Sequence, residues 1–263
     1  MGIRAEKRMD AIRQQIVAEG KVSVPELVRS FGVSEVTVRR YLAALERRGV
    51  LVRTYGGAVK SEAGFSADFL FNEKLERHTA EKQAIARACM ELIGEDEIIF
   101  LDTGTTTLEI ARCLREANVA VTVVTNSLPA TTELMGAQRV KILLIGGFLR
   151  RELLDFHGQF TQREITQVSF HQSFLGVDGI SVGCGLSTTD IATAQVEEAV
   201  IQRSQAVNIV ADSSKIGRVS LIAYGNVGEL KKTKRLITDR RAPRNEVEGL
   251  RRAGFEIIQV KLP

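Results

Sequence analysis

The chain has 263 residues, of which 44% are hydrophobic and 26% are charged. These fractions lie close to the averages of globular proteins and exclude a disordered or collagen-like chain. The length favours two domains, one small and one of ordinary size. No apolar run approaches the roughly 18 residues that a membrane span requires, and the polar start of the chain leads into no hydrophobic stretch. We therefore expect a cytoplasmic protein with no membrane partner.

The positive charge of the chain is concentrated at its N-terminus. Residues 1–60 contain 12 Lys and Arg against 6 Asp and Glu, whereas the remainder of the chain is slightly acidic. This asymmetry favours a polyanion as the partner of the N-terminal segment, with solvated surface charge as the alternative.

The cysteines give no sign of metal binding or of a disulfide framework. Cys89, Cys113 and Cys184 are far apart in the sequence, odd in number, and form no Cys-x-x-Cys pair. Structural zinc sites and disulfide scaffolds need paired cysteines. We expect Cys89 and Cys113 to be reduced thiols packed among apolar residues.

Three helices and a β-hairpin are predicted in residues 1–60. Apolar residues recur at helical spacing over residues 4–19, and Gly20 ends that helix. The Ser-Val-Pro-Glu sequence at residues 23–26 is a capping box for a second helix that ends near Phe31. A third helix, capped by Ser34, is predicted to continue to Gly49.

The third predicted helix has an apolar face and a polar face. Val38, Leu42 and Leu45 share one face, which we expect to pack on the first two helices. Polar and basic residues gather on the other face in the first two turns, where a recognition helix meets DNA. An arginine there can bridge two acceptors on guanine or contact a phosphate, and both roles stay open. The candidate DNA-reading residues are Ser34, Glu35, Thr37, Arg39 and Arg40.

A β-hairpin is predicted directly after the third helix. Residues 50–53 alternate like a strand, residues 54–57 form a turn with two glycines, and residues 58–60 return. Arg53 and Tyr55 at the tip would reach the DNA backbone or the minor groove. The pattern predicts a winged helix-turn-helix that binds double-stranded operator DNA; a three-helix bundle with a plain hairpin is the alternative.

The sequence of this segment resembles the N-terminal signature of the DeoR family of bacterial sugar-responsive regulators. The matching stretches are Val33-Ser-Glu-Val-Thr-Val-Arg-Arg-Tyr-Leu42, Leu45-Glu46 and Tyr55-Gly-Gly-Ala58. Tyr41 stands where the family usually has an acid. We expect its hydroxyl to be able to meet a phosphate, which adds Tyr41 to the candidate DNA-binding residues.

A linker and a larger domain follow. Residues 61–74 are predicted to be a linker, and residues 75–263 an effector-sensing and oligomerisation domain. Helical patterns, beginning with residues 81–92, alternate with short apolar runs, which predicts an α/β domain with a mostly parallel sheet. The predicted strands are 98–101, 121–125, 140–145, 172–177, 207–211, 235–238 and 256–260.

Ligands of parallel sheets bind at the carboxyl ends of the strands, so the loops there are the candidate site. The loop Asp102-Thr103-Gly104-Thr105-Thr106 follows a strand and opens a helix, so its amides and hydroxyls can cradle an anion. A simple helix cap is the alternative for this loop. The sequence contains neither a P-loop ending nor a dinucleotide-binding glycine motif, so we expect no cofactor. The loops after other strands hold Asn126, Gly146, Gly147 and Asp178.

These loops resemble the effector domain of the DeoR family, which is related in fold to ribose-5-phosphate isomerase. The resemblance implies a Rossmann-like, mostly parallel sheet that binds a phosphorylated sugar or polyol. Lysines of the entry helix and the Asp and Lys of an Ala-Asp-x-Ser-Lys loop are implicated in effector binding in the family. They correspond here to Lys82, Asp212 and Lys215, and Lys74 is a further candidate. The family often has a basic pair where this chain has Glu197 and Glu198.

Together these features predict a repressor of a carbohydrate-catabolism operon. Its operator affinity would change when a phosphorylated sugar, polyol or sugar acid binds the second domain. A dimer or tetramer is expected, because one winged helix covers a single half-site. The alternatives are an aldose-ketose phosphate isomerase, for which the sequence offers no convincing catalytic set, and a constitutive DNA-binding protein whose second domain only oligomerises.

Overall fold

The chain forms two compact units, Met1–Glu73 with Arg151–Leu153, and Lys74–Arg150 with Leu154–Pro263. The computed structural model describes residues 19–47, 51–60, 71, 74–225 and 233–262, together with residues 5, 8, 9, 11, 12, 15 and 16. Most of the predicted linker 61–74 lies outside the described residues, and the domain boundaries at residues 60 and 75 stay predictions. No described helix is long and apolar enough to cross a membrane.

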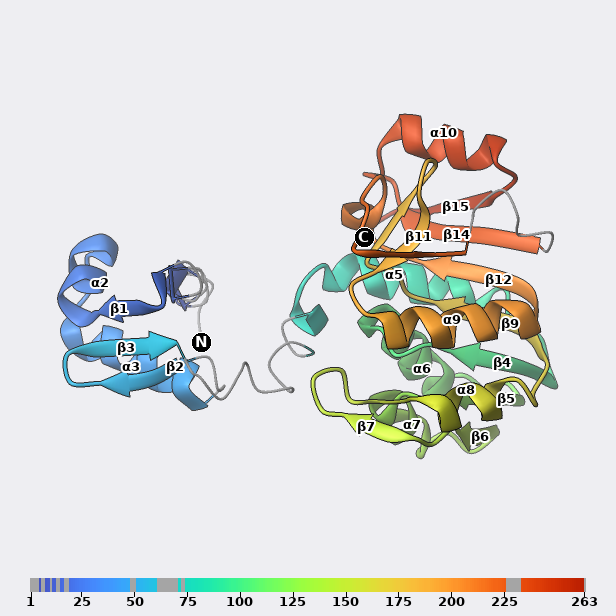
Figure 1. Ribbon diagram of the computed structural model, residues 1–263, viewed down its shortest axis with the longest axis horizontal. Helices are drawn as coiled ribbons and strands as arrows, with labels where there is room; N and C mark the ends of the chain where they lie inside the picture. Colours follow the sequence, from blue (N-terminus) through green and yellow to red (C-terminus); the bar gives the residue numbers. More distant parts are fainter. Residues whose placement is uncertain are drawn as a thin grey trace. The chain divides into compact units, whose positions relative to one another are not determined.

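The first unit contains the predicted helices and hairpin, joined by a strand that the sequence did not indicate. Helices α2 (Val24–Phe31) and α3 (Glu35–Arg47) are followed by strands β2 (Leu51–Thr54) and β3 (Gly57–Lys60) (Figure 1). The hydroxyl of Ser23 accepts from the amide of Glu26 at 3.3 Å, as the capping box predicts. Strand β1 (Lys21–Ser23) pairs antiparallel with β3, so the wing belongs to a three-stranded sheet of order β1-β3-β2.

The core of the first unit lies between its helices and the small sheet. The residues described in the first predicted helix are helical, and Met9, Ile12 and Ile16 are buried. They join Leu27 of α2 and the apolar face of α3 in one cluster. Gly32 adopts a left-handed conformation (φ 59°) after α2, which a glycine reaches without strain and which turns the chain into α3.

Tyr41 belongs to this core and does not face solvent. Its side chain is 3% exposed and packs in the cluster with Val38 and Leu45. Because Tyr41 follows Val38 by three residues and precedes Leu45 by four, it shares their helical face. The prediction that Tyr41 meets a phosphate was therefore wrong.

A seven-stranded parallel sheet forms the centre of the second unit. Its strand order is β15-β14-β12-β9-β4-β5-β6, and every neighbouring pair is parallel, as predicted. The strands are β4 (Glu97–Leu101), β5 (Val121–Thr125), β6 (Val140–Leu144), β9 (Phe170–Leu175), β12 (Ser204–Val210), β14 (Thr233–Asp239) and β15 (Glu256–Val260).

Helices cover both faces of this sheet, and each face has its own apolar core. In β4 the side chains of Ile99 and Leu101 pack into one core and that of Phe100 into the other, as strand periodicity requires. One face is covered by α5 (Thr79–Met90), α6 (Thr105–Glu116) and α7 (Leu128–Leu134). The other is covered by α8 (Gln159–Ile165), α9 (Ile191–Arg203) and α10 (Arg244–Arg252) (Figure 1).

Two small antiparallel sheets lie outside the predicted pattern. Strands β7 (Phe148–Arg150) and β8 (Asp155–His157) form a hairpin after β6. Strands β10 (Gly179–Ser181), β11 (Gly185–Thr188) and β13 (Ile222–Tyr224) form a three-stranded sheet. Tyr224 and residues of β10 and β11 join the core that α9 covers. These strands of three or four residues are too short for their periodicity to be read from the sequence.

The burial of Tyr41 predicts a stability effect without a direct effect on DNA binding. Tyr41→Ala should lower the free energy of unfolding of the first unit by about 3–5 kcal/mol, because it leaves a cavity in the core. Tyr41→Phe keeps the ring and should change operator affinity by no more than about twofold. Thermal unfolding and operator titrations of the full chain check both variants. A large loss of affinity in a stably folded Tyr41→Phe variant would mean that the hydroxyl contacts DNA.

Candidate functional site

The candidate DNA-reading helix α3 begins with a polar cap. The hydroxyl of Ser34 accepts from the amide of Thr37 at 3.3 Å and lies 3.0 Å from the Thr37 hydroxyl. A side chain that satisfies an orphan amide in this way stabilises the start of a helix. Ser34 and Thr37 therefore set the start of the helix, and both hydroxyls have a partner before DNA arrives.

The two arginines of α3 differ in their partners. Arg39 forms an ion pair with Glu35 one turn earlier, with Nη2 and Oε1 2.5 Å apart. Both side chains are more than half exposed, and such an exposed pair contributes only about 0.3–0.5 kcal/mol. Arg40 is exposed and has no ion-pair partner in the part of the chain that the structure describes. Arg40 is therefore free to meet DNA, and Arg39 can exchange Glu35 for a phosphate or a base at small cost.

The wing is held to the end of α3 by Arg53. Its backbone amide and its Nε donate to the two carboxylate oxygens of Glu46 at 3.0 and 2.7 Å. The backbone hydrogen bond and then the Arg53 side chain hold the pKa of Glu46 below its ordinary value. Tyr55 at the turn is fully exposed. Arg53 thus positions the wing, whereas Tyr55 offers its whole side chain to a partner.

Sequence reasoning missed one exposed residue of α3. Val36 lies in the first turn and is 77% exposed, among the most exposed large apolar side chains of the described residues. Its position, three and four residues before Arg39 and Arg40, places it on the polar face of the helix. The signal available in the sequence was an apolar residue that lies outside the buried face formed by Val38, Leu42 and Leu45.

The strand order of the large sheet reverses between β4 and β9. Asp102 follows β4, and its Oδ2 accepts from the backbone amide of Gly176, which follows β9, at 2.9 Å. A side chain at Gly176 would approach this carboxylate at 3.3 Å. Burial raises the pKa of Asp102 to about 6, although backbone hydrogen bonds from Thr103 and Gly176 oppose that rise. The structure thus brings two predicted loops together at the point where ligands of doubly wound sheets bind.

The loop after Asp102 opens helix α6 with unsatisfied amides. Gly104 is the N-cap, no side chain caps the helix, and no acidic residue stands in its first turn. Thr105 and Thr106 are buried and Thr103 is half-buried. The first amides of a helix have no intrahelical acceptor, so this end of α6 favours an anion.

Lys82 and Lys215 approach the same edge of the sheet. Lys82 on α5 is buried, and its Nζ donates to the backbone carbonyls of Lys74 and Leu75. Burial lowers its pKa to about 8, although the charge of Asp212 opposes that fall. Burial also lowers the pKa of Lys215, against the charge of Asp178. Each lysine is therefore poorly solvated, and an anion at this place would interact with it strongly.

The predicted acidic residues have different surroundings. Asp212 caps the short helix η1 (Ser213–Lys215) by accepting from the Ser214 amide at 3.0 Å. Asp178 pairs with Lys74 at 3.3 Å and accepts from the amide and hydroxyl of Thr189. Burial alone would raise the pKa of Asp178, but Lys74 and Thr189 hold it below its ordinary value. Asp178 is thus an organising residue of its loop, with its oxygens already engaged.

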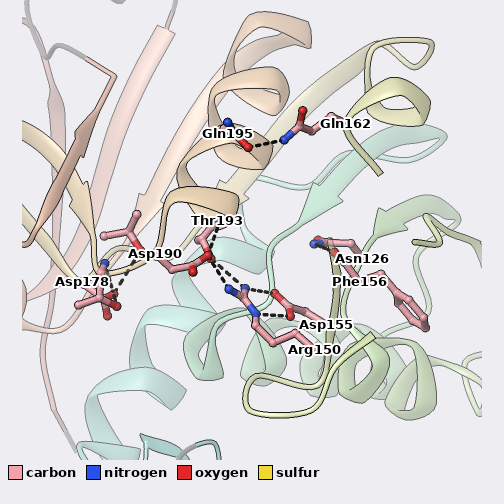
Figure 2. Close-up of polar contacts among 11 residues, drawn as sticks. Asn126, Arg150, Asp155, Phe156, Gln162, Asp178, Asp190, Thr193 and Gln195 are labelled. Atoms are coloured by element: carbon pink, nitrogen blue, oxygen red, sulfur yellow. Dashed lines mark hydrogen bonds and ion pairs between the residues drawn. The ribbon is translucent and has the colours of Figure 1, made fainter. Parts of the chain in front are cut away.

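Asn126 and the Gly146-Gly147 pair are organised by the β7–β8 hairpin region. Asn126 donates from Nδ2 to the Phe156 carbonyl at 2.8 Å (Figure 2), while its Oδ1 is buried and has no partner among the described residues. A side chain at Gly147 would collide with Thr161 Oγ1 at 2.2 Å. The glycine is therefore required by packing against α8, and its presence is no sign of a ligand.

Arg150 forms a buried junction that the sequence did not indicate. Its guanidinium binds both oxygens of Asp155 at 2.9 and 2.6 Å and also contacts Asp190 and Thr193 at the start of α9 (Figure 2). Its side chain is 13% exposed and that of Asp155 is 3% exposed. This fork ties the β7–β8 hairpin to α9. An Asp-Arg pairing over forty residues leaves no periodic trace in a sequence.

The acidic pair of α9 divides into one buried and one exposed residue. Glu197 is 3% exposed, whereas Glu198 faces solvent. Burial, and then the charge of Asp102, raise the pKa of Glu197 well above its ordinary value.

The described residues contain no cluster of side chains that could hold a metal ion, and the three cysteines are unpaired.

Comparison with known proteins assigns both parts of the chain. Residues 8–63 match the DeoR-like helix-turn-helix domain, and residues 77–240 match the DeoR C terminal sensor domain. The putative aga operon transcriptional repressor of Escherichia coli O157:H7 is 35% identical over 97% of this chain and 93% of that protein. The lactose phosphotransferase system repressor of Staphylococcus epidermidis is 32% identical over 85% of this chain and 88% of its own.

Among solved structures, the chain is similar to ribose 5-phosphate isomerase A from Neisseria gonorrhoeae, with a TM-score of 0.39, 16% identity, and coverage of 59% of this chain and 55% of that one. The matched families and the curated relatives are transcriptional regulators and not enzymes, in contrast to the isomerase alternative. The chain belongs to the DeoR family of transcriptional regulators, with the helix-turn-helix at its N-terminus and the sensor domain after it.

Proposed function

We propose that the chain represses a carbohydrate-catabolism operon and that a phosphorylated sugar, polyol or sugar acid in the second unit controls its operator affinity. The observation that carries the proposal is the uncapped start of α6 beside Lys82 and Lys215, at the point where the strand order reverses. Free amides, hydroxyls and two poorly solvated cations together favour a phosphate. Relatives named for an aga operon and for a lactose phosphotransferase system support a sugar-related operon.

The effector residues we propose have separate tasks. Thr103, Gly104, Thr105 and Thr106 present amides and hydroxyls to the phosphate, and Lys82 and Lys215 supply its counter-charge. Asp102, Asn126 and Asp212 accept from the effector's hydroxyls. Gly146, Gly147 and Asp178 act through the loops that they shape.

The DNA contacts we propose start from α3 and the wing. Arg40 and Arg39 read bases or phosphates, Val36 packs on a thymine methyl, and Tyr55 reaches the flanking backbone. Ser34, Glu35, Thr37 and Arg53 position these side chains. Two copies of the chain, or two pairs, then engage symmetric half-sites.

Effector binding changes operator affinity when it favours one of two arrangements of the DNA-binding units. Such coupling typically amounts to about 1–3 kcal/mol, a change of roughly 5- to 150-fold. Titration of DNA from upstream of the regulated genes, with and without a panel of sugar, hexitol and sugar-acid phosphates, tests the proposal. If no compound changes operator affinity or thermal stability, the second unit only oligomerises and the proposal fails.

Arg40→Ala is expected to weaken operator binding at least about tenfold, because Arg40 is exposed and unpaired before DNA binds. The salt dependence of binding separates its two possible contacts: the slope falls by about one for a lost phosphate contact and is preserved for a lost base contact. Arg251→Ala, which removes an exposed charge from α10 of the other unit, is the matched control. If the wild-type chain and Arg40→Ala bind the operator with equal affinity, Arg40 does not contact the DNA.

Lys82→Met and Lys215→Met should each weaken effector binding by about ten- to a hundredfold, because each removes a charged donor to the phosphate. Lys141→Met removes an exposed lysine from β6 and serves as control. The measurement is the effector concentration that produces half of the maximal change in operator occupancy. If both variants respond at the same effector concentration as the control, the phosphate does not bind at these lysines.

Effector affinity should also fall as the pH rises above about 8. Lys82 has a pKa of about 8 in the free protein, so above that pH a proton must be taken up when the phosphate binds. The affinity should then fall by up to about tenfold for each further pH unit. Lys82→Arg stays charged throughout and should flatten the profile between pH 7.5 and 9.5, roughly the range over which Lys82 titrates. Calorimetric titrations in buffers of different ionisation enthalpy detect the proton uptake directly.

A further inference from the structure

The helical turn at which the second unit begins is held by residues of the candidate effector site. Residues 74–76 are helical and lie shortly before α5, and we call them the docked turn. The backbone carbonyls at the end of a helical segment have no intrahelical donor, so donors from elsewhere must satisfy them. Here the donors come from α5 and from the loop that opens α6.

Two of the side chains to which we assign the phosphate converge on the carbonyl of Lys74. Its oxygen accepts from Nζ of Lys82 and from the hydroxyl of Thr105, the latter at 3.4 Å. Nζ of Lys82 also donates to the Leu75 carbonyl at 3.1 Å. Lys82 and Thr105 are both buried, so water does not readily supply another acceptor. An acceptor oxygen of the chain itself thus lies between the two proposed phosphate donors.

The side chain of Lys74 is held by the loop after β9. Its Nζ lies 3.3 Å from Oδ1 of Asp178. Burial first, and then the charge of Lys74, lower the pKa of Lys215, against the charge of Asp178. The docked turn therefore interacts with three parts of the candidate site: α5, the start of α6 and the loop after β9.

A phosphate and the docked turn need the same donors. The hydroxyl of Thr105 has one hydrogen, so a phosphate oxygen that accepts it takes it from the Lys74 carbonyl. Burial lowers the pKa of Lys82 to about 8, which means that two neutral carbonyls do not fully replace the water that its ammonium group has lost. In such poorly solvated surroundings the charge of a phosphate attracts the ammonium group more strongly than a carbonyl does.

We propose that the docked turn competes with the effector: a phosphate at the start of α6 takes the donors of Lys82 and Thr105 from the Lys74 carbonyl and releases the turn. This inference rests on the proposed function and assigns the regulation of that same site. The residues before the docked turn lead along the chain to the helix-turn-helix. The effector then binds the released arrangement in preference to the docked one, which is the difference that a regulatory ligand needs.

Hydrogen exchange of the full chain, measured by mass spectrometry, tests the release. The probes are inorganic phosphate and the phosphates of the panel above, with potassium chloride at the same ionic strength as control. We expect the amides of residues 103–107 to exchange more slowly with phosphate bound and those of residues 75–79 to exchange more rapidly, because the turn loses the donors that the phosphate gains. Slower or unchanged exchange at residues 75–79, together with protection at residues 103–107, overturns the inference and leaves the proposed function intact.

Thr79→Val weakens the docked turn without changing the loop that opens α6. The exposed hydroxyl of Thr79 donates to the carbonyls of Leu75 and Glu76 at 3.4 and 3.1 Å. Because the turn and the phosphate compete, this variant should bind the same probes about three- to tenfold more tightly in calorimetric titrations. Thr132→Val removes an exposed hydroxyl that donates to the Leu128 carbonyl on α7, and as the matched control it should bind like the wild-type chain.

The outcomes separate this inference from the proposed function. If Thr79→Val binds the probes no more tightly than the control, the side chains of Lys82 and Thr105 only cap the turn, and the inference is wrong while the proposed function stands. If neither inorganic phosphate nor any sugar, polyol or sugar-acid phosphate protects residues 103–107 or changes operator affinity, the proposed function fails and the inference fails with it.

Discussion

The hydrogen bond from the amide of Gly176 to the carboxylate of Asp102 joins the two halves of the parallel sheet at its carboxyl edge. It spans the one pair of strands, β4 and β9, at which the strand order reverses. The close approach of the two loops favours a glycine at position 176, because a side chain there would crowd the carboxylate. Asp102 is buried where it accepts this hydrogen bond, and its burial raises the pKa of its carboxyl group. The uncapped start of α6 follows directly, so the same constraint places the anion-binding groups.

The second unit also contains buried charged side chains, and these are paired with one another. Arg150 neutralises Asp155 and holds the β7–β8 hairpin against α9. Removal of one partner from such a buried pair typically costs about 3–5 kcal/mol, since a charge is left uncompensated. Because α9 is anchored in this way, Glu197 is held in the interior, where burial and then the charge of Asp102 raise the pKa of its carboxyl group.

The main elements followed from the sequence where the pattern was long or fully buried. All seven strands of the large sheet were predicted within about three residues, because each is a short apolar run between helical patterns. The helix-turn-helix was predicted because its caps and apolar faces have fixed spacings. Tyr41 was placed wrongly, because an aromatic residue with a hydroxyl fits a DNA-facing position as well as a core, and the resemblance drew attention to the acid that the family usually has at that position. The helical spacing of Tyr41 from Val38 and Leu45 already predicts the buried position that the structure shows.

The sequence by itself determined the two-part organisation of function: a basic segment with a helix-turn-helix pattern, and a sheet whose strand ends hold Asp102, Asn126 and Asp212. These are local properties, since they depend on periodicity and on motifs within a few residues. Only the tertiary structure decided which of these side chains already have partners within the protein, and it alone revealed the junction at Arg150 and the burial of Glu197. The physical reason is that burial and charge pairing depend on residues far apart in the chain, and no local pattern records those distant neighbours.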